Sequence, residues 1–371
     1  MPPPWLWLFG ACGAGKTATG FELYRQLGAE GRRVGFIEID QVGMCLPDDD
    51  PIRAPIKTEN LMAALRNFRA VGAESVIVSG DLAGPPMQQL LDRYGARQPA
   101  LVRLRADPRE SERRLRRRGA PSQYIEWSHS YDTHFDRGAD VTIDTSQLTV
   151  AEAAARIRSE LPAWPPPADQ HHDHSDRSIE PSGYPGEAVL ICGATPVGKS
   201  TVAWQVFMRG LAGNVSTAYV DLAQIGWLYA AEDPNAVVEL KSRNLVTMWR
   251  NFARQGAKRL IISGALHCAR DLECYRAALP AVDIRVYNLT ATTSSLIRRA
   301  LLRGEGRATE LPGDDLRDQP REYLEQLAIA ASGNASAGQY PATVTSVDTD
   351  NREPESIADD IAATAFTSRR P

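Results

Sequence analysis

The chain has 371 residues, a net charge of −4 at neutral pH and 43% hydrophobic residues. This length suffices for two domains with full cores, and the slightly acidic balance excludes a global field that attracts nucleic acid or an acidic membrane surface. No apolar run approaches the ~18 residues that a membrane span needs. The five cysteines show no paired spacing, so we expect reduced thiols and a cytoplasmic protein.

The first part of the chain alternates short apolar runs with helical stretches. The apolar runs predict five strands, at 5–9, 34–39, 75–79, 100–105 and 140–144. Helical periodicity between them predicts helices, for example at 17–31 and 59–72. Buried strands separated by helices are typical of a parallel sheet that is covered on both faces.

A glycine-rich loop follows the first predicted strand. The string GACGAGKT at 10–17 has the form G-x-x-x-x-G-K-[ST], which lets backbone N–H groups surround a phosphate at a helix N-terminus. Lys16 would neutralise phosphate oxygens, and Thr17 would offer its hydroxyl to Mg²⁺. The residues expected to hold the nucleotide are Gly10, Gly13, Ala14, Gly15, Lys16, Thr17 and Ala18.

Carboxylates follow the next two strands. Glu38 and Asp40 end the second strand, two residues apart, and Asp81 follows the third strand. Because the strand tips of a parallel sheet meet at one edge, we expect these acids to converge beside the loop. One can hold Mg²⁺ through water, and another can accept the proton of an attacking hydroxyl. The alternative is that Glu38 and Asp40 are solvated acids at the end of a strand.

Basic and amide side chains flank this predicted site. Arg114 and Arg118 lie four residues apart on a helix after the fourth strand, where a lid would close on phosphates; a solvated basic helix is the alternative. No aromatic platform accompanies them, which argues against nucleic-acid binding. Gln41, Lys57 and Asn60 would face an acceptor molecule, although Asn60 could instead serve its own helix end.

The second half of the chain repeats the first. At an offset of 183 residues, FIEIDQVGM (36–44) lies on YVDLAQIGW (219–227), and the matches continue in the same order with little drift. This predicts an internal duplication with domains at 1–162 and 187–371, joined by a proline- and histidine-rich linker at 163–186. We expect no metal site in this linker and expect the copies to pack as a pseudo-dimer.

The second copy keeps the loop and loses acids. Its strands are predicted at 188–192, 217–222, 259–263, 284–289 and 343–348. Its nucleotide-binding residues would be Gly193, Val197, Gly198, Lys199, Ser200, Thr201, Arg299 and Arg303, with Ser200 and Asp221 at the metal and Asp221, Gln224, Lys241 and Asn244 toward the acceptor. However, Ala223 stands opposite Asp40 and Ala265 opposite Asp81. The first copy is therefore expected to be the better enzyme.

These motifs resemble those of the P-loop small-molecule kinases. GACGAGKT, EID after the second strand, SGD after the third and RRLRRRG before a strand ending in IDTS carry the resemblance, over about 1–160 and 187–365. The group includes shikimate kinase, gluconate kinase, adenylylsulfate kinase and chloramphenicol phosphotransferase. The chain also resembles ATP-binding proteins of unassigned function common in actinomycetes.

The resemblance has consequences for fold and chemistry. It implies two nucleotide-kinase-like domains, each a doubly wound parallel sheet of about five strands, with ATP and Mg²⁺ as cofactors. In shikimate-kinase-like members, an acid at the end of the second strand orients or deprotonates the acceptor hydroxyl, which implies that role for Asp40, with Glu38 nearer the metal.

Two functional hypotheses follow. The first is a Mg-ATP-dependent phosphotransferase acting on the hydroxyl of a small molecule, with specialised metabolism as a candidate setting; Asp40 and Asp81 favour it. The second is a nucleotide-dependent switch or regulatory ATPase in which ATP binding controls the arrangement of the two copies. The losses at Ala223 and Ala265 keep this second hypothesis open.

Overall fold

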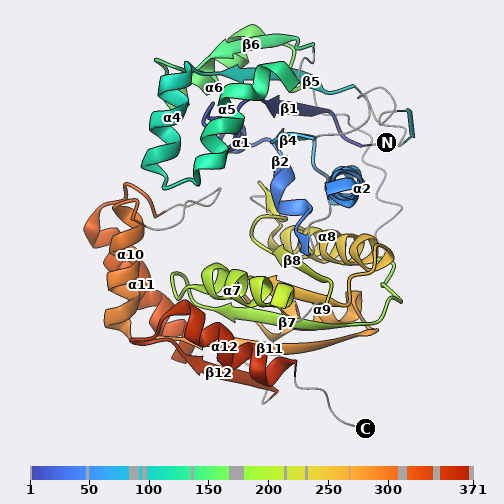
Figure 1. Ribbon diagram of the computed structural model, residues 1–371, viewed down its shortest axis with the longest axis vertical. Helices are drawn as coiled ribbons and strands as arrows, with labels where there is room; N and C mark the ends of the chain where they lie inside the picture. Colours follow the sequence, from blue (N-terminus) through green and yellow to red (C-terminus); the bar gives the residue numbers. More distant parts are fainter. Residues whose placement is uncertain are drawn as a thin grey trace. The chain divides into compact units, whose positions relative to one another are not determined.

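The computed structural model divides the chain into two compact units (Figure 1). It describes all residues except 1, 47–49, 83–91, 94–97, 135–137, 167–178, 213–214, 230–232, 267, 308–315, 337–342 and 367–371. The first unit comprises 1–42, 57–178 and 226–240, and the second comprises 43–56, 179–225 and 241–371. The histidines of the predicted linker lie outside the described residues, and the domain boundaries at 162 and 187 stay predictions.

Five parallel strands form most of the sheet in the first unit. They are β1 (Trp5–Phe9), β2 (Val34–Glu38), β4 (Ser75–Ser79), β5 (Ala100–Arg105) and β6 (Val141–Asp144). The strand order is β6-β5-β1-β4-β2, followed by a sixth strand, β9 (Trp227–Leu228). The five parallel strands end within a residue of the predicted ones. The sheet buries β1, β2 and β4 on both faces, whereas β5 and β6 are only partly buried. The predicted α/β fold with parallel sheets is confirmed.

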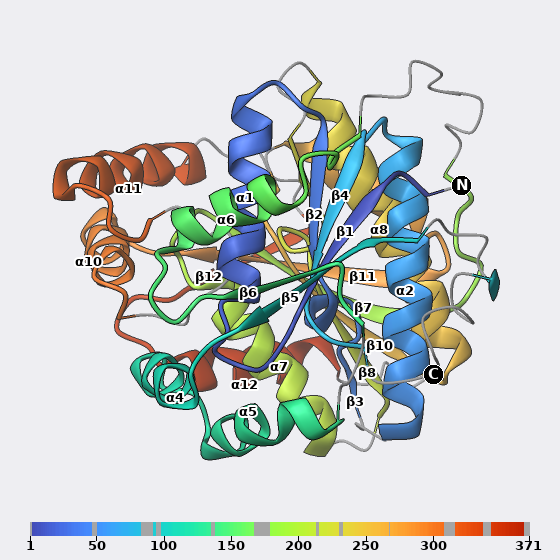
Figure 2. The ribbon, with the colours of Figure 1, turned by 90° about the horizontal axis from the view of Figure 1, so that it is seen from above.

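Helices cover both faces of this sheet. They are α1 (Lys16–Ala29), α2 (Asp50–Ala70), α4 (Pro108–Arg117), α5 (Ser122–His134) and α6 (Val150–Glu160). In Figure 2, α1 and α6 lie together on one side of the strands and α2 lies on the other. The core contains Leu8 of β1, Leu23 and Leu27 of α1, and Ile157 of α6. This packing fixes the start of α1 at the carboxyl end of β1.

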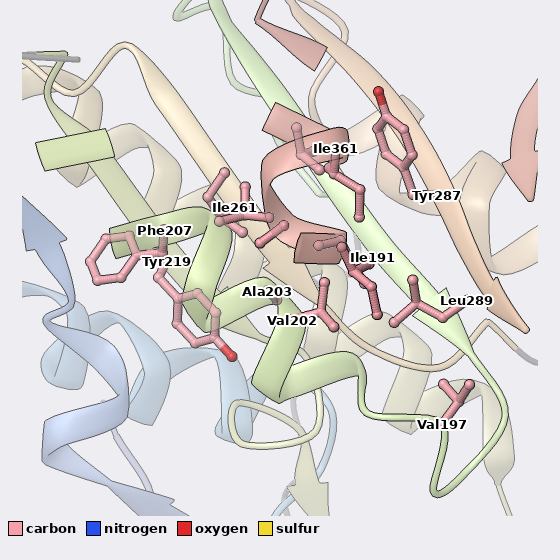
Figure 3. Packing of buried hydrophobic residues seen from close by; sticks show 14 of the residues in the cluster. Ile191, Val197, Val202, Ala203, Phe207, Tyr219, Ile261, Tyr287, Leu289 and Ile361 are labelled. Atoms are coloured by element: carbon pink, nitrogen blue, oxygen red, sulfur yellow. The ribbon is translucent and has the colours of Figure 1, made fainter. Parts of the chain in front are cut away.

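The second unit repeats the arrangement. Its parallel strands are β7 (Gly186–Gly193), β8 (Thr217–Asp221), β10 (Arg259–Ser263), β11 (Val282–Thr290) and β12 (Val344–Asp348), in the order β12-β11-β7-β10-β8-β3. Its helices are α7 (Lys199–Ala212), α8 (Pro234–Arg254), α9 (Ala269–Ala278), α10 (Thr293–Gly304), α11 (Arg321–Ser336) and α12 (Pro354–Ala365). Figure 3 shows Val202 and Phe207 of α7 packed with Ile191 and Ile261 of the sheet.

The sixth strand of each sheet comes from the opposite half of the sequence. Strand β9 (Trp227–Leu228) pairs antiparallel with β2, and β3 (Cys45–Leu46) pairs antiparallel with β8. We call residues 43–56 and 226–240 the exchanged segments. The sequence predicted about five strands per sheet and missed these two, because a two-residue strand has no periodicity that a pattern could reveal.

Aromatic packing anchors the exchanged segment of the first unit. The Trp227 ring meets the rings of Phe21 and Tyr24 edge-on at centroid distances of 5.0 and 6.4 Å. Tyr229 covers Gly28, where a Cβ would lie 2.2 Å from its ring. In the second unit, Met44 and Leu46 occupy equivalent places and pack against the core. Each unit is therefore completed by side chains from the other half of the chain.

Candidate functional site

The first glycine loop joins β1 to α1 in a conformation that only glycine permits. A Cβ on Gly10 would lie 2.0 Å from the Leu104 carbonyl oxygen of the neighbouring strand. Gly15 has φ of 90° directly before α1, a left-handed value that favours glycine. All residues predicted to hold the nucleotide in the first copy lie in this loop or in the first turn of α1. The loop therefore directs backbone N–H groups into one small space at a helix N-terminus.

The first-copy residues around this loop form one network. Lys16 Nζ donates to the carbonyl oxygens of Gly10 (2.5 Å) and Ala11 (3.1 Å) and lies 3.1 Å from Asp81 Oδ2. Thr17 Oγ1 donates to Glu38 Oε1 over 2.7 Å. The structure therefore brings Lys16, Thr17, Glu38 and Asp81 together, as their positions at strand ends predicted.

Burial and charge set the protonation of these groups. Burial acts to lower the pKa of Lys16, but Asp81, Cys12 and Asp40 together outweigh it, so the pKa lies above its ordinary value. Burial raises the pKa of Glu38, and the hydrogen bond from Thr17 opposes this rise. Lys16 thus stays protonated. A cation bound near Glu38 would stabilise its charged form and lower its pKa.

Asp40 and Lys57 form an ion pair beside the loop. Asp40 lies in a 3₁₀ turn (Ile39–Val42) after β2, and its side chain is 62% exposed, which leaves it open to a ligand. Gln41 is half-buried in the same turn. Asn60 is fully buried, and its Nδ2 donates to the Val42 carbonyl oxygen over 2.5 Å. The structure thus places Asn60 against the turn that carries Asp40.

The two predicted arginines differ in position. Arg114 of α4 donates to the carbonyl oxygen of Gly13 (3.2 Å) and to both oxygens of Thr145 (3.0 and 2.7 Å). Its guanidinium therefore holds α4 against the backbone of the glycine loop. Arg118 is the C-cap residue of α4, and its positive charge contributes a small lowering to the pKa values of Cys12 and Glu38.

The second loop keeps part of this network. Lys199 Nζ donates to the Ala194 carbonyl oxygen over 3.1 Å, and Ser200 Oγ donates to Asp221 Oδ2 over 2.7 Å. Arg299 bridges the carbonyl oxygen of Val197 (2.8 Å) and Thr349, as Arg114 does in the first copy. Of the other predicted second-loop residues, Gly193 ends β7, Gly198 lies in the loop before α7, and Thr201 lies in the first turn of α7.

The acceptor-side residues of the second copy are mostly buried. Asn244 Nδ2 donates to the Ile225 carbonyl oxygen over 2.6 Å, which matches the bond from Asn60. Gln224 is 3% exposed. Lys241 is half-buried near the charges of Asp271 and Asp221. The asparagines of both copies thus have the same local hydrogen bond at the start of the exchanged segments.

Two pairs of residues contact the predicted sites although the sequence did not single them out. Ser79 donates to the Thr17 hydroxyl, and Ser263 donates to the Ser200 hydroxyl, each over 3.3 Å. Thr145 and Thr349 accept the guanidinium of Arg114 and Arg299. The strings SG after the third strand and DT after the last strand occur in both halves. Their repetition is the signal that could have identified them.

The two loop lysines differ in acidity. Burial lowers the pKa of Lys199 to about 8, because Asp221 offsets burial only in part and Arg303 adds to its effect. Lys16 avoids this through Asp81, whose counterpart is Ala265. An anion bound at the second loop would raise the pKa of Lys199 again.

We therefore predict that polyphosphate binding at the second loop takes up protons above pH about 8, whereas binding at the first loop does not. The sign is fixed because the free protein has lost the Lys199 proton there and the complex regains it. Calorimetry of Lys16→Ala in two buffers of different ionisation enthalpy measures the uptake. In Ala265→Asp the uptake should shrink; an unchanged value would contradict this account.

The oxygen atoms at the first loop suit Mg²⁺. The Thr17 hydroxyl and the Glu38 carboxylate are bonded to each other, and Mg²⁺ in such sites combines one or two protein oxygens with water and substrate phosphates. Among the described residues, no three His, Cys, Asp or Glu side chains form a self-sufficient metal cage. No helix in the described ranges is long and apolar enough to cross a membrane.

Comparisons with known proteins found one family match and several similar structures. Residues 7–134 match a family described as an AAA domain. Among solved structures, the chain is similar to the Mycobacterium tuberculosis APS kinase CysC in complex with AMPPNP and APS (15% identity, TM-score 0.32, 43% of this chain and 98% of that one). It is also similar to a gluconokinase from Sinorhizobium meliloti 1021 (12% identity, TM-score 0.29, 48% of this chain and 91% of that one). No curated protein matches. The family match and the two loops indicate a nucleotide-binding P-loop protein.

Proposed function

We propose that the first unit is an ATP- and Mg²⁺-dependent phosphotransferase that acts on the hydroxyl group of a small molecule. The observation that carries the proposal is the set of three carboxylates around one phosphate-binding loop: Glu38 on Thr17, Asp81 on Lys16, and Asp40 on Lys57. A loop that only holds nucleotide needs one acid near its metal, so the additional acids favour chemistry on an acceptor.

The residues divide the work of phosphoryl transfer. Backbone N–H groups of the loop and Lys16 would hold the β- and γ-phosphates, and Arg118 would stabilise charge on the transferring group. Thr17 and Glu38 would hold Mg²⁺, which supplies further neutralisation of the phosphate oxygens when bound. The acceptor oxygen would attack the γ-phosphorus, the bond to the β-phosphate oxygen would break, and Asp40 would take the hydroxyl proton.

Asp40 is the residue whose replacement tests this assignment. Replacing a general base lowers turnover by about 10²–10⁴-fold without removing the groups that hold the nucleotide. We therefore expect Asp40→Asn to lose transfer of labelled γ-phosphate to a mixture of hydroxylated metabolites while it binds ATP with nearly unchanged affinity.

The matched control for this experiment is Asp107→Asn. Asp107 caps α4 by accepting from the Arg109 N–H, so its change should leave turnover intact. A loss of ATP affinity in Asp40→Asn with normal turnover of bound ATP would contradict the role of Asp40 as a base. Failure of wild type to label any hydroxylated acceptor would contradict the transfer reaction itself.

A second candidate function, the nucleotide-dependent switch, is favoured by the exchanged segments. Segment 43–56 leaves the first unit directly after the turn that carries Asp40 and returns at Lys57. The Asp40–Lys57 ion pair and the bond from Asn60 to Val42 hold its two ends. A ligand that breaks this ion pair would therefore act on a segment whose strand β3 belongs to the other sheet.

Hydrogen exchange at the edge of the second sheet tests the switch. We expect ligand binding at the first loop to change the exchange rate of the Tyr219 amide, which donates to the Met44 carbonyl oxygen over 2.9 Å. Lys199→Ala keeps the second loop empty in this experiment. Unchanged exchange at Tyr219 with a saturated first loop would rule out coupling through this segment.

A further inference from the structure

Each of the two lysines at the first site forms an ion pair with its own acid. Lys16 pairs with Asp81, and Lys57 pairs with Asp40. Glu38 accepts one hydrogen bond, from Thr17 to Oε1, and the described residues offer no other hydrogen bond to it. Its second carboxylate oxygen is therefore open to a metal or its water. A ligand with several negative charges meets three carboxylates here, so a divalent cation must accompany it.

The second site has the same cations and has lost two acids. Ala265 replaces Asp81, and Lys199 hydrogen-bonds only to the Ala194 carbonyl oxygen (3.1 Å) and to Thr195 Oγ1 (3.5 Å) among the described residues. Ala223 replaces Asp40, and Lys241 forms no hydrogen bond or ion pair within the described part of the chain. Two half-buried lysines thus lie at this site without a carboxylate in hydrogen-bond contact, although the charge of Asp221 acts on both and that of Asp271 acts on Lys241.

The acid that remains, Asp221, accepts three hydrogen bonds from the protein. Asp221 Oδ2 accepts from Ser200 Oγ (2.7 Å) and from the Tyr219 hydroxyl (3.5 Å), and Oδ1 accepts from the Ala223 N–H (2.9 Å). Its side chain is 4% exposed. Both oxygens accept hydrogen bonds, whereas Glu38 accepts one, so a Mg²⁺ ion at Asp221 would compete with more protein partners than one at Glu38.

We infer that the second loop binds a polyphosphate ligand, a nucleoside triphosphate or its phosphate chain, as the magnesium-free anion. Lys199 would contact the phosphates in the loop, and Lys241 would contact an anionic group on the acceptor side. Association with Mg²⁺ lowers the charge of such a ligand, which weakens its attraction to unpaired lysines and strengthens it toward a carboxylate-rich site. The inference rests on the proposed function only in taking the second loop as a phosphate site.

The missing acids also imply that the second site would neither hydrolyse nor transfer the phosphate of this ligand. The second site has no carboxylate at the positions of Asp40 and Asp81 to accept a proton from an attacking hydroxyl or water. A ligand held there would therefore be stable on the time scale of turnover at the first site. The fraction of second sites that are occupied would rise with the concentration of nucleotide that is not bound to Mg²⁺.

Calorimetric titration of single-loop variants tests the inference. Lys16→Ala leaves the second loop intact, and Lys199→Ala leaves the first. We expect Lys16→Ala to bind ATP about tenfold tighter in EDTA than in excess Mg²⁺, a difference of ~1.4 kcal/mol, and Lys199→Ala to show the opposite order. Tighter binding of ATP with Mg²⁺ by Lys16→Ala, or no binding in either buffer, would overturn it.

Two further measurements keep the test independent of one variant. Wild type should fill one site in EDTA and a second when Mg²⁺ is added; two sites that both require Mg²⁺ would also overturn the inference. Ala265→Asp gives Lys199 the partner that Lys16 has. At the second site of this variant, the affinity for ATP in Mg²⁺ should therefore rise relative to the affinity in EDTA. Inorganic triphosphate in place of ATP identifies the ligand: equal affinity indicates the phosphate chain, and weaker affinity indicates the nucleotide.

Failure of this inference and failure of the proposed function would be seen in different variants. Phosphate transfer is measured with Lys199→Ala, which has only the first loop, whereas metal-free binding is measured with Lys16→Ala. Loss of transfer in the first experiment leaves the second unaffected.

Discussion

Lys16→Ala is expected to lower phosphate transfer by about 10²–10³-fold, because it removes a fixed cation from the phosphates of the transition state. Lys16 bridges the loop carbonyls and Asp81 at 2.5–3.1 Å, and nearby charge keeps it protonated. Without it, Asp81 faces the phosphates with an uncompensated negative charge. The measurement is transfer of labelled γ-phosphate under saturating ATP and Mg²⁺.

Lys199→Ala is the matched control, because it makes the same change at the same place in the other copy. We expect this variant to transfer phosphate at a rate close to wild type, since the second copy has no acid at the positions of Asp40 and Asp81. An equal loss in both variants would show that the loops act together, and our assignment of the reaction to the first copy would be wrong.

The parallel sheets and the loops could be predicted from the sequence because each depends on local pattern. The strand at 5–9 is a run of five apolar residues, and the structure buries all of them. The string GACGAGKT requires glycine for reasons that the structure then shows, such as the 2.0 Å approach of a Gly10 Cβ to Leu104. Such signals need no knowledge of distant contacts.

The exchanged segments could not be predicted because they depend on contacts between distant parts of the chain. Trp227 follows β8, which is the counterpart of β2 in the second copy. The sequence therefore favours a place for Trp227 in the sheet of the second unit. Instead it packs on Phe21 and Tyr24, about half the sequence away. Asn60 shows the same limit: the sequence predicted a place facing the acceptor or a role at its own helix end, whereas its bond to Val42 is visible only in three dimensions.

The arginines illustrate an intermediate case. Helical spacing predicted one shared position for Arg114 and Arg118, and similarly for Arg299 and Arg303, but it could not separate their contacts. Arg114 is committed to the carbonyl oxygen of Gly13 and to Thr145, whereas the charge of Arg118 acts on Glu38. Side chains four residues apart share a helix face, yet their lengths and neighbours decide which one reaches a ligand.

Trp227→Ala is expected to destabilise the first unit, although Trp227 belongs to the second half of the sequence. Its half-buried ring packs against Phe21 and Tyr24, and its strand pairs with β2. Loss of this ring should cost about 2 to 3 kcal/mol, below the value for a fully buried tryptophan. The measurement is amide hydrogen exchange, which should accelerate in β2 and β4 and not in β10.

Met44→Ala provides the reciprocal test, because Met44 occupies the equivalent position and packs against the core of the second unit. Exchange should accelerate in β8 and β10 and not in β4, with a smaller cost of about 1 to 2 kcal/mol for the smaller side chain. Trp127→Ala controls for removal of a large ring, because this side chain is 56% exposed. If each variant instead loosened only the sheet of its own half, strand exchange between the copies would be excluded. The two results together therefore decide whether either half of the chain can form a complete unit without the other.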